Sequence, residues 1–331
     1  MKSFYRVRIA GTGSYLPEKL LSNKDLEKMV ETSDEWIRER TGIVNRHIAS
    51  DNEATSDLAL KASLKALEEA QISPKELDLI LVATVSPDQI MPSTACELQA
   101  KLDARHCMAF DLSAACSGFL YGLSIANEFI ATGRYKNILV VGAEVLHHFV
   151  DYTKRETCIL FGDAAGAAVL TAAKDYEESC IYSHHMAANG TLADLLILPA
   201  GGSKMPCSEE VLKERLNYVR MKGREIFKHA VRTMTDRCQE ALDANQMQLS
   251  DIDWIIPHQA NTRIIEAVAK SLKAPLEKFI ITIEDMGNTS AATIPVSFDM
   301  AIRDGRIQRG QNILMTAFGA GLTSGSVLMR Y

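Results

Sequence analysis

Two pairs of apolar segments repeat along the chain at one constant offset, and this repetition constrains the fold more than any other feature. Residues 78–82 resemble residues 253–256, and residues 137–140 resemble residues 312–315, with an offset of 175 residues in both pairs. In each half, an apolar strand is followed by a turn of small residues, a helix and a second apolar strand. This order is typical of layered α/β structure, in which helices cover mainly apolar strands. The sequence therefore predicts an α/β fold made of two similar halves.

The halves meet near residue 175, where the charged run 174–178 interrupts the apolar pattern. We therefore divide the chain into an N-terminal half, residues 1–175, and a C-terminal half, residues 176–331. A chain of 331 residues with 47% hydrophobic content can bury a large core, and we expect the two halves to share that core. Residues 187–217 are rich in glycine, proline and charge; we interpret them as an excursion before the next long helix and assign them no function.

Cys116 lies in a turn of small residues, 113–119, that opens directly into an amphipathic stretch ending near Thr132. Unpaired backbone N–H groups and the positive end of the dipole meet at a helix start, so we expect a thiolate there to be stabilised. The pKa of the thiol would then fall well below the ordinary value of about 8.5. Taken alone, a buried and inert core cysteine is the simpler interpretation. Two distant segments favour a nucleophile instead.

The first of these segments is an apolar run, 255–257, that ends in His258 and passes into a helical pattern. The second is a small-residue turn, 285–292, that carries Asn288, whose amide can donate N–H. A single histidine or a single Asn-Thr-Ser turn is more often structural. A nucleophilic cysteine, an imidazole and an amide together are the components of a site that handles thioesters.

Four collinear segments, residues 111–119, 161–168, 257–263 and 287–295, resemble β-ketoacyl-acyl-carrier-protein synthase III, a condensing enzyme of the thiolase superfamily. The similarity covers essentially the whole chain. It implies a thiolase-like five-layer αβαβα fold. It also implies a reaction in two steps: an acyl-coenzyme A acylates Cys116, and malonyl-acyl-carrier protein then loses carbon dioxide and attacks that thioester.

The second step develops negative charge on the malonyl thioester oxygen. His258 through a ring N–H and Asn288 through its amide are suited to stabilise that charge. An amide differs from the usual third member of a hydrolase triad, which orients a base, and this disfavours a thiol hydrolase. The resemblance implies an oxyanion hole made by the backbone N–H groups of Cys116 and Ala320. Glycine is frequent in the family at the position of Ala320. A tight turn between strands is the alternative explanation for this loop.

The resemblance also implies contacts to coenzyme A. Thr32, Trp36 and Arg155 would flank the adenine, because a nucleobase can lie between an indole and a guanidinium. Glu156 stands where the family often has glycine. The resemblance places further contacts near the phosphates, at Arg40 and Arg263, and along the pantetheine tunnel, at Gly223, Phe227, Ala260 and Asn261.

A basic stripe is predicted on the first long helix of the second half. Arg224, Lys228 and Arg232 recur every four residues, while apolar residues occupy another face. With Arg263 and Lys270, this stripe would dock an acidic carrier protein. A solvated helix face is the alternative.

At two positions of the family pattern, this chain has smaller side chains than are frequent in the family. Met91 aligns with a frequent phenylalanine that reaches the acyl tunnel of the neighbouring subunit in dimeric relatives, and Ser324 replaces a frequent tryptophan. Methionine is flexible and can vacate space that a rigid ring would block. We therefore expect a homodimer whose acyl pocket, lined by Met91 and Phe318, accepts acetyl-coenzyme A and also longer starters.

Composition excludes several classes of protein. Seven cysteines without a C-x-x-C pair disfavour a disulfide framework and a zinc site, and they fit a reducing cytosol. Residues 1–13 hold only a brief apolar run, and no apolar run of about 18 residues occurs elsewhere, so we expect a cytoplasmic protein without a membrane partner. A net charge of −6 argues against general nucleic-acid binding.

Two further motifs have simpler explanations. Gly11-Thr12-Gly13 begins like a dinucleotide fingerprint, but Leu16 and Pro17 break it, which favours a strand-to-loop turn. The pairs at 147–148 and 184–185 are adjacent histidines that would need further ligands to bind a metal, and we expect them on the surface or in loops. No metal and no resident cofactor are expected, since coenzyme A thioester is the substrate.

Three functions therefore stay open. The first is the initiating condensation of fatty-acid synthesis, and the second is the same chemistry on another acceptor in secondary metabolism. The third is a non-catalytic acyl-coenzyme A binding protein, which the joint presence of Cys116, His258 and Asn288 disfavours.

Overall fold

The structure is a computed structural model that describes residues 5–174 and 177–331. Two β-sheets form its frame, and in each sheet the repeated apolar segments lie side by side as parallel neighbours: β4 beside β6, and β11 beside β12. Their side chains are almost all buried, as expected for strands covered by helices on both faces. The predicted α/β fold of two similar halves is confirmed; the predicted boundary at residues 175 and 176 lies outside the described residues.

The five-stranded sheet has the order β1-β7-β6-β4-β5, with β5 at an edge. Its strands are β1 (Val7–Tyr15), β4 (Leu79–Ala83), β5 (Met108–Leu112), β6 (Asn137–Glu144) and β7 (Ala164–Ala172). The four-stranded sheet has the order β11-β12-β13-β8. Its strands are β8 (Cys180–Ala187), β11 (Trp254–Pro257), β12 (Asn312–Gly319) and β13 (Thr323–Arg330).

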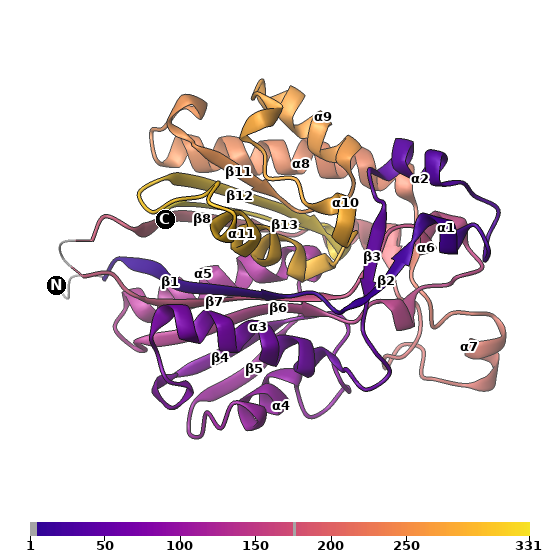
Figure 1. Ribbon diagram of the computed structural model, residues 1–331, viewed down its shortest axis with the longest axis horizontal. Helices are drawn as coiled ribbons and strands as arrows, with labels where there is room; N and C mark the ends of the chain where they lie inside the picture. Colours follow the sequence, from indigo (N-terminus) through magenta and orange to yellow (C-terminus); the bar gives the residue numbers. More distant parts are fainter. Residues whose placement is uncertain (1–4, 175–176) are drawn as a thin grey trace.

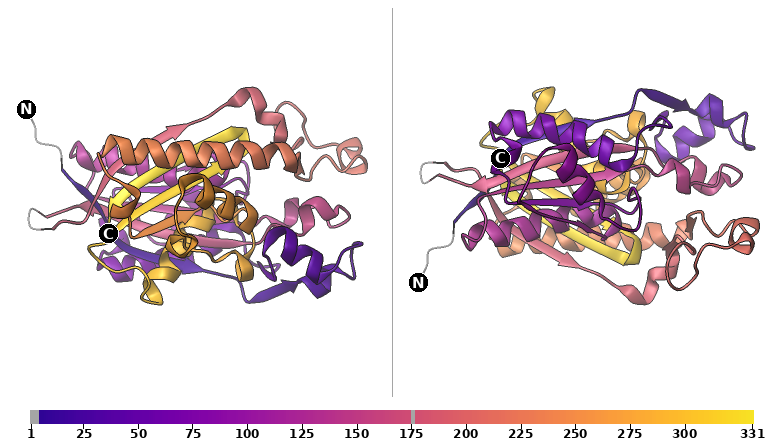
Figure 2. Two further views of the ribbon diagram at one scale, coloured as in Figure 1. Left: turned by 90° about the horizontal axis from the view of Figure 1, so that it is seen from above. Right: turned by 90° about the horizontal axis from the view of Figure 1, so that it is seen from below.

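Helices and sheets alternate in five layers (Figure 1). Helices α3 (Thr55–Ala70) and α4 (Thr94–Lys101) cover the outer face of the five-stranded sheet, and α5 (Gly118–Ala131) and α11 (Thr293–Arg303) lie between the sheets. Figure 2 shows the long helix α8 (Gly223–Ala244) crossing the outer face of the four-stranded sheet, where α9 (Thr262–Leu272) packs beside it. This is the expected αβαβα architecture.

The Gly11-Thr12-Gly13 motif lies inside β1 and packs against α3. A Cβ at Gly11 would lie 2.4 Å from the carbonyl oxygen of Ala66, and one at Gly13 would lie 2.3 Å from that of Ala62. Both glycines therefore serve close packing of strand against helix, which agrees with the rejection of a dinucleotide fingerprint.

Most of the remaining α-helices and short strands gather at one end of the molecule (Figure 1). The excursion at residues 187–217 is joined to the first half by an ion pair of Arg215 with Asp151 at 2.6 Å. None of the helices within the described ranges is both long and apolar enough to cross a membrane. The short helices and strands are β2 (Lys19–Ser22), α1 (Asn23–Leu26), α2 (Asp34–Thr41), β3 (Asn45–Ile48), α6 (Arg155–Cys158), β9 (Leu196–Ile197), α7 (Glu209–Lys213), β10 (Arg220–Met221) and α10 (Ile283–Met286), and the 3-10 helices are η1 (Pro74–Glu76), η2 (Ala115–Ser117), η3 (His147–Phe149), η4 (Gly190–Leu195), η5 (Leu249–Asp251), η6 (Leu276–Lys278), η7 (Ser290–Ala292) and η8 (Ala320–Leu322).

Candidate active site

Three turns from distant parts of the chain bring the predicted reactive residues into one cavity of about 650 Å³. Cys116 comes from η2 before α5, His258 follows β11, and Asn288 precedes η7. Their relative exposures are 7%, 2% and 8%, so all three lie at the buried side of the cavity. Carboxyl ends of parallel strands and starts of internal helices converge here, which is why residues so far apart in sequence meet.

The Cys116 thiol differs from the sequence-based expectation. Burial raises its pKa to about 12; the nearby Glu144 carboxylate adds to this effect, and a hydrogen bond with Ser290 opposes it. The prediction of a lowered pKa is therefore wrong. The helix start is present, since α5 begins two residues after Cys116, but the loss of water around the sulfur outweighs it.

His258 is neutral in this cavity because burial lowers the pKa of its imidazole to about 3. Its backbone N–H donates to the carbonyl oxygen of Thr316 at 2.8 Å, and its Nδ1 lies 2.7 Å from the hydroxyl of Thr293. That hydroxyl also lies 3.0 Å from the carbonyl oxygen of Ser290. If the Thr293 hydroxyl donates to Nδ1, the imidazole proton is on Nε2, which is then an N–H donor. If the hydroxyl instead donates to the carbonyl oxygen of Ser290, it can accept from Nδ1–H, and Nε2 is then an acceptor. Thr293 therefore suits both tautomers.

Asn288 is oriented by its own turn. Its Oδ1 accepts from the backbone N–H of Ser290 at 2.9 Å. Its backbone N–H donates to Leu160 at 2.9 Å, and its carbonyl oxygen accepts from Gly162 at 3.1 Å. With the amide oxygen engaged, the amide N–H₂ is the group available to a ligand, as enolate stabilisation requires.

A buried arginine supports the loop that holds Asn288. Arg46 is fully buried and donates to the carbonyl oxygen of Ile159 and to Oδ1 of Asn23. Ile159 immediately precedes Leu160, so the guanidinium lies directly beneath the backbone that binds Asn288. Nothing in the local sequence pattern around Arg46 indicated this role, because the contact crosses from β3 to the segment after α6.

The C-terminal end of β12 approaches Cys116 at Gly319. A Cβ on Gly319 would lie 2.7 Å from the backbone nitrogen of Cys116, and Gly319 lines the cavity. Ala320 is the first residue of η8, where a backbone N–H has no partner within the helix. The requirement for glycine therefore falls on Gly319 and on Gly321, whose φ is 70°, which explains why alanine is tolerated at 320.

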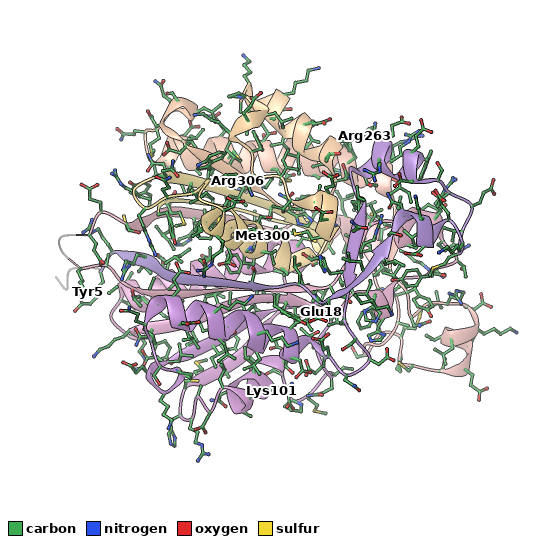
Figure 3. The ribbon with its side chains drawn as sticks, in the orientation of Figure 1. Tyr5, Glu18, Lys101, Arg263, Met300 and Arg306 are labelled. Atoms are coloured by element: carbon green, nitrogen blue, oxygen red, sulfur yellow. The ribbon has the colours of Figure 1, made fainter. Side chains whose placement is uncertain are left out.

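The cavity mouth is basic. Arg40, Arg224, Lys228 and Arg263 line it, with Glu156 among them, and Figure 3 places Arg263 at the end of the molecule where α2 lies. The predicted tunnel residues line the same cavity: Gly223, Phe227, Ala260 and Asn261.

Two other basic residues predicted for carrier docking lie beyond the mouth. Arg232 and Lys270 do not line the cavity, and Arg232 is 3.7 Å from Asp236 in an ion pair one turn along α8. The basic surface at the mouth is therefore shorter than the predicted stripe.

The predicted adenine slot is closed. The guanidinium of Arg155 lies 4.4 Å from the centroid of the Trp36 ring, whereas a base between them would need roughly 7 Å, twice the packing distance of about 3.5 Å. Arg155 also donates to the carbonyl oxygen of Glu31 at 3.1 Å. The adjacent Thr32 hydroxyl is buried without a hydrogen-bond partner among the described residues. This hydroxyl is therefore available to donate or accept a hydrogen bond beside the slot.

Of the two predicted residues of the acyl pocket, Phe318 lines the cavity and Met91 does not. Met91 is 82% exposed and its neighbour Ile90 is 83% exposed. Ser324 is buried, and its hydroxyl lies 3.3 Å from the carbonyl oxygen of Ala187.

The histidine pairs are accounted for by structural contacts. His147 pairs with the buried Asp163 at 2.5 Å, and His184 and His185 lie on β8 beside Glu128 and Glu240. In the part of the chain that the structure describes, no group of three or more His, Cys, Asp or Glu side chains is arranged to hold a metal.

Known proteins resemble the chain over nearly its whole length. Two family profiles match it: 3-oxoacyl-[acyl-carrier-protein] synthase III over residues 110–190, and the C-terminal part of the same enzyme over residues 242–331. The chain is 53% identical over 324 residues to the β-ketoacyl-[acyl-carrier-protein] synthase III of Xanthomonas campestris, with 98% of each protein covered.

Solved structures are similar to this chain over a comparable share of its length. The 3-oxoacyl-[acyl-carrier-protein] synthase III of Aquifex aeolicus shares 49% identity with a TM-score of 0.90, and the match covers 98% of this chain and 100% of that one. The priming β-ketosynthase of the R1128 polyketide biosynthetic pathway shares 32% identity with a TM-score of 0.91, covering 100% of this chain and 98% of that one.

Proposed function

Because the chain belongs to the β-ketoacyl-acyl-carrier-protein synthase III family of condensing acyltransferases, we propose that it joins an acyl-coenzyme A starter to malonyl-acyl-carrier protein and so initiates fatty-acid synthesis. One observation carries this proposal: a cysteine, an imidazole and an amide meet at the buried side of a cavity whose mouth is basic.

In the first step, the acyl-coenzyme A phosphates bind at Arg40 and Arg263 while pantetheine follows the cavity inward. Adenine binding requires Arg155 to leave the face of Trp36, and Thr32 then supplies a polar contact. The sulfur of Cys116 attacks the thioester carbonyl, and the carbonyl oxygen accepts hydrogen bonds from the backbone N–H groups of Cys116 and Ala320. Coenzyme A leaves, so it is a substrate, and the proposed reaction calls for no resident cofactor.

In the second step, malonyl-acyl-carrier protein loses carbon dioxide, and the carbanion attacks the acyl group on Cys116. His258 as the Nε2–H tautomer and Asn288 through its amide donate to the enolate oxygen. The Thr293 hydroxyl and the Oδ1 contact of Asn288 hold these donors before charge develops, so little reorganisation is needed in the transition state.

The carrier protein docks at the mouth of the cavity. Arg224 and Lys228 on α8 and Arg263 on α9 line this mouth, and they would attract an acidic partner. Arg232 contributes less, because Asp236 offsets its charge.

The protein is proposed to act as a homodimer. Strand β5 is an unpaired edge of its sheet, and Met108 at its start is 46% exposed. Ile90 and Met91 form a second apolar surface, at 83% and 82% exposure. Edge strands with exposed apolar residues favour pairing with another chain. A second copy would cover them and bring Met91 to the acyl pocket of its partner. Sedimentation equilibrium of wild type and of Met91→Asp tests this assembly.

A cytoplasmic location is proposed from the cysteines. All seven are free, and Cys96 and Cys207 are exposed, which suits a reducing compartment.

The priming β-ketosynthase among the similar structures supports a second candidate, the same condensation on another acceptor in secondary metabolism. A panel of acyl-coenzyme A starters, assayed against malonyl-acyl-carrier protein and malonyl-coenzyme A, separates the two. Cys116→Ala is the control, because Cys116 is the one cysteine among the described residues that line the cavity. A stoichiometric acyl adduct on the mutant, seen by intact-mass analysis, would refute the nucleophile.

A further inference from the structure

Arg46 on β3 is a buried cation without an anionic partner. By volume it is the largest of the fully buried side chains among the described residues. Within those residues its guanidinium forms no ion pair with a carboxylate. A guanidinium keeps its proton inside a protein, so neutral oxygens alone must compensate the positive charge. Such burial is costly, and an apolar side chain of similar volume often packs as well. Packing alone therefore does not explain Arg46.

The guanidinium donates to neutral oxygens on two sides. On one side, Nε donates to the carbonyl oxygen of Ile159 at 3.2 Å, and Nη2 donates to the same oxygen. On the other side, Nη1 donates to Oδ1 of Asn23 and to the carbonyl oxygen of Val44 at 3.4 Å. Asn23 in turn donates to Oδ1 of Asp34, the first residue of α2, at 2.8 Å. The guanidinium thus fixes the segment after α6 relative to β3 and α2.

The stem of Arg46 packs against the two segments that hold Asn288. A Cβ on Gly162 would lie 3.3 Å from Cβ of Arg46, and one on Gly287 would lie 3.1 Å from Cγ of Arg46. Residues 161 and 288 pair as a parallel β-bridge, and backbone hydrogen bonds join Asn288 to residues 160 and 162. One side chain therefore supports the backbone next to Asn288 and the segment that binds it.

The other two reactive residues are held by different contacts. His258 is bound by Thr316 through its backbone and by Thr293 through its ring. Cys116 lies in η2, which packs against η7, α5, β12, β13 and η8. The hydrogen bonds of Arg46 reach neither residue. A shift of residues 159–162 should therefore displace the amide of Asn288 more than the imidazole or the thiol.

We propose that Arg46 is a positioning residue for malonyl decarboxylation, which holds the amide of Asn288 where the enolate oxygen forms. The inference rests on the proposed function, because it assigns Arg46 to the second step of that reaction. Arg46 is fully buried and does not line the cavity, so it acts through the backbone of residues 159–162. Donors to the enolate must be in place before charge develops, and a misplacement of about 1 Å can cost on the order of 10²-fold in rate.

Arg46→Met tests this role because it keeps an apolar stem and removes the guanidinium. Acylation by acetyl-coenzyme A is followed by intact-mass analysis, and the acylated protein is then mixed with malonyl-acyl-carrier protein to measure carbon dioxide release in a single turnover. We expect acylation within about threefold of wild type and carbon dioxide release slower by at least about tenfold, the usual effect of losing a hydrogen bond to a charged group. The loss should not exceed that of Asn288→Ala.

A double-mutant cycle shows whether Arg46 acts through Asn288. In the Asn288→Ala background, Arg46→Met should change carbon dioxide release by less than about twofold, because the amide that it positions is absent. A tenfold further fall in that background would overturn the inference. An equal loss of acylation and decarboxylation in Arg46→Met would also overturn it, since that is the effect of a general structural role.

Arg309→Met is the matched control. Arg309 also donates to backbone carbonyl oxygens, those of Ile9 at 2.8 Å and Ala10 at 3.1 Å, and it does not line the cavity. The ratio of its acylation rate to its decarboxylation rate should stay that of wild type.

Circular dichroism melts establish that each variant is folded. If Arg46→Met does not fold, Arg46→Lys decides by the same cycle. Lysine keeps the charge but lacks the fork that reaches Ile159 and Asn23 together, so carbon dioxide release should fall by about threefold or more, and the fall should vanish in the Asn288→Ala background. Release at the wild-type rate, or a fall that persists in that background, overturns the inference.

The same assay separates this inference from the proposed function. If acylated wild type releases no carbon dioxide from malonyl-acyl-carrier protein, the proposed function fails and the role of Arg46 fails with it. If wild type releases carbon dioxide and the effects of Arg46→Met and Asn288→Ala simply add, only the positioning role fails.

Discussion

Gly319→Ala should slow acylation of Cys116 without closing the cavity mouth. The added Cβ would lie 2.7 Å from the backbone nitrogen of Cys116, 2.9 Å from the Thr323 hydroxyl and 3.2 Å from Cβ of Ala115. Carbon contacts settle near 3.5–4.0 Å, so the loop must move back by roughly 1 Å. The oxyanion-hole donors belong to the two segments that would separate.

The size of the effect follows from that displacement. A misplacement of about 1 Å can cost on the order of 10²-fold in rate, and loss of one oxyanion-hole donor costs about 10²–10³-fold. We therefore expect acylation by acetyl-coenzyme A to slow by about 10²-fold, with little change in the concentration of acetyl-coenzyme A that half-saturates the protein.

Quenched-flow sampling with intact-mass analysis measures this rate. Gly190→Ala is the control substitution, because nothing lies within 4 Å of a Cβ at that position. Acylation of Gly319→Ala at the wild-type rate, in a folded protein, would show that the loop after β12 does not support the transition state.

Three further predictions concern the second substrate and the starter. In His258→Ala and Asn288→Ala, acylation should persist in part while malonyl decarboxylation falls by on the order of 10²-fold or more; unchanged release of carbon dioxide would remove the enolate site. Reversing Lys228 and Arg263 to Glu should raise the Michaelis constant for malonyl-acyl-carrier protein and blunt its salt dependence, and an unaffected constant at low salt would contradict docking there. Met91→Phe should narrow a starter range that includes butyryl- and hexanoyl-coenzyme A; strict acetyl preference in both proteins would refute the pocket hypothesis.

The layered fold was predictable because the burial of a strand can be read from the apolar residues of its own sequence. Residues 79–83 and 254–257 are continuous apolar runs, and such runs fit strands covered on both faces. The segments around Cys116, His258 and Asn288 were recognisable for a similar reason. Close packing of these turns against other backbone requires small residues, and such residues are visible in the local sequence.

Contacts between distant elements were not predictable in this way. Glu144 at the end of β6 and Ser290 in η7 lie 146 positions apart, and no local pattern marks either as a neighbour of Cys116. Arg46 supports Asn288 through Ile159, and Thr293 reaches His258 only because α11 runs between the sheets.

The sequence by itself determined the architecture, the reactive side chains and the family. Apolar periodicity, small-residue turns and motif order are local properties that survive without coordinates. The tertiary structure decided the protonation of those side chains. A helix start alone predicts a lowered thiol pKa for Cys116, yet burial raises it and lowers that of His258. It also decided that Arg155 covers Trp36. Desolvation depends on every atom that encloses a group, and those atoms come from all parts of the chain.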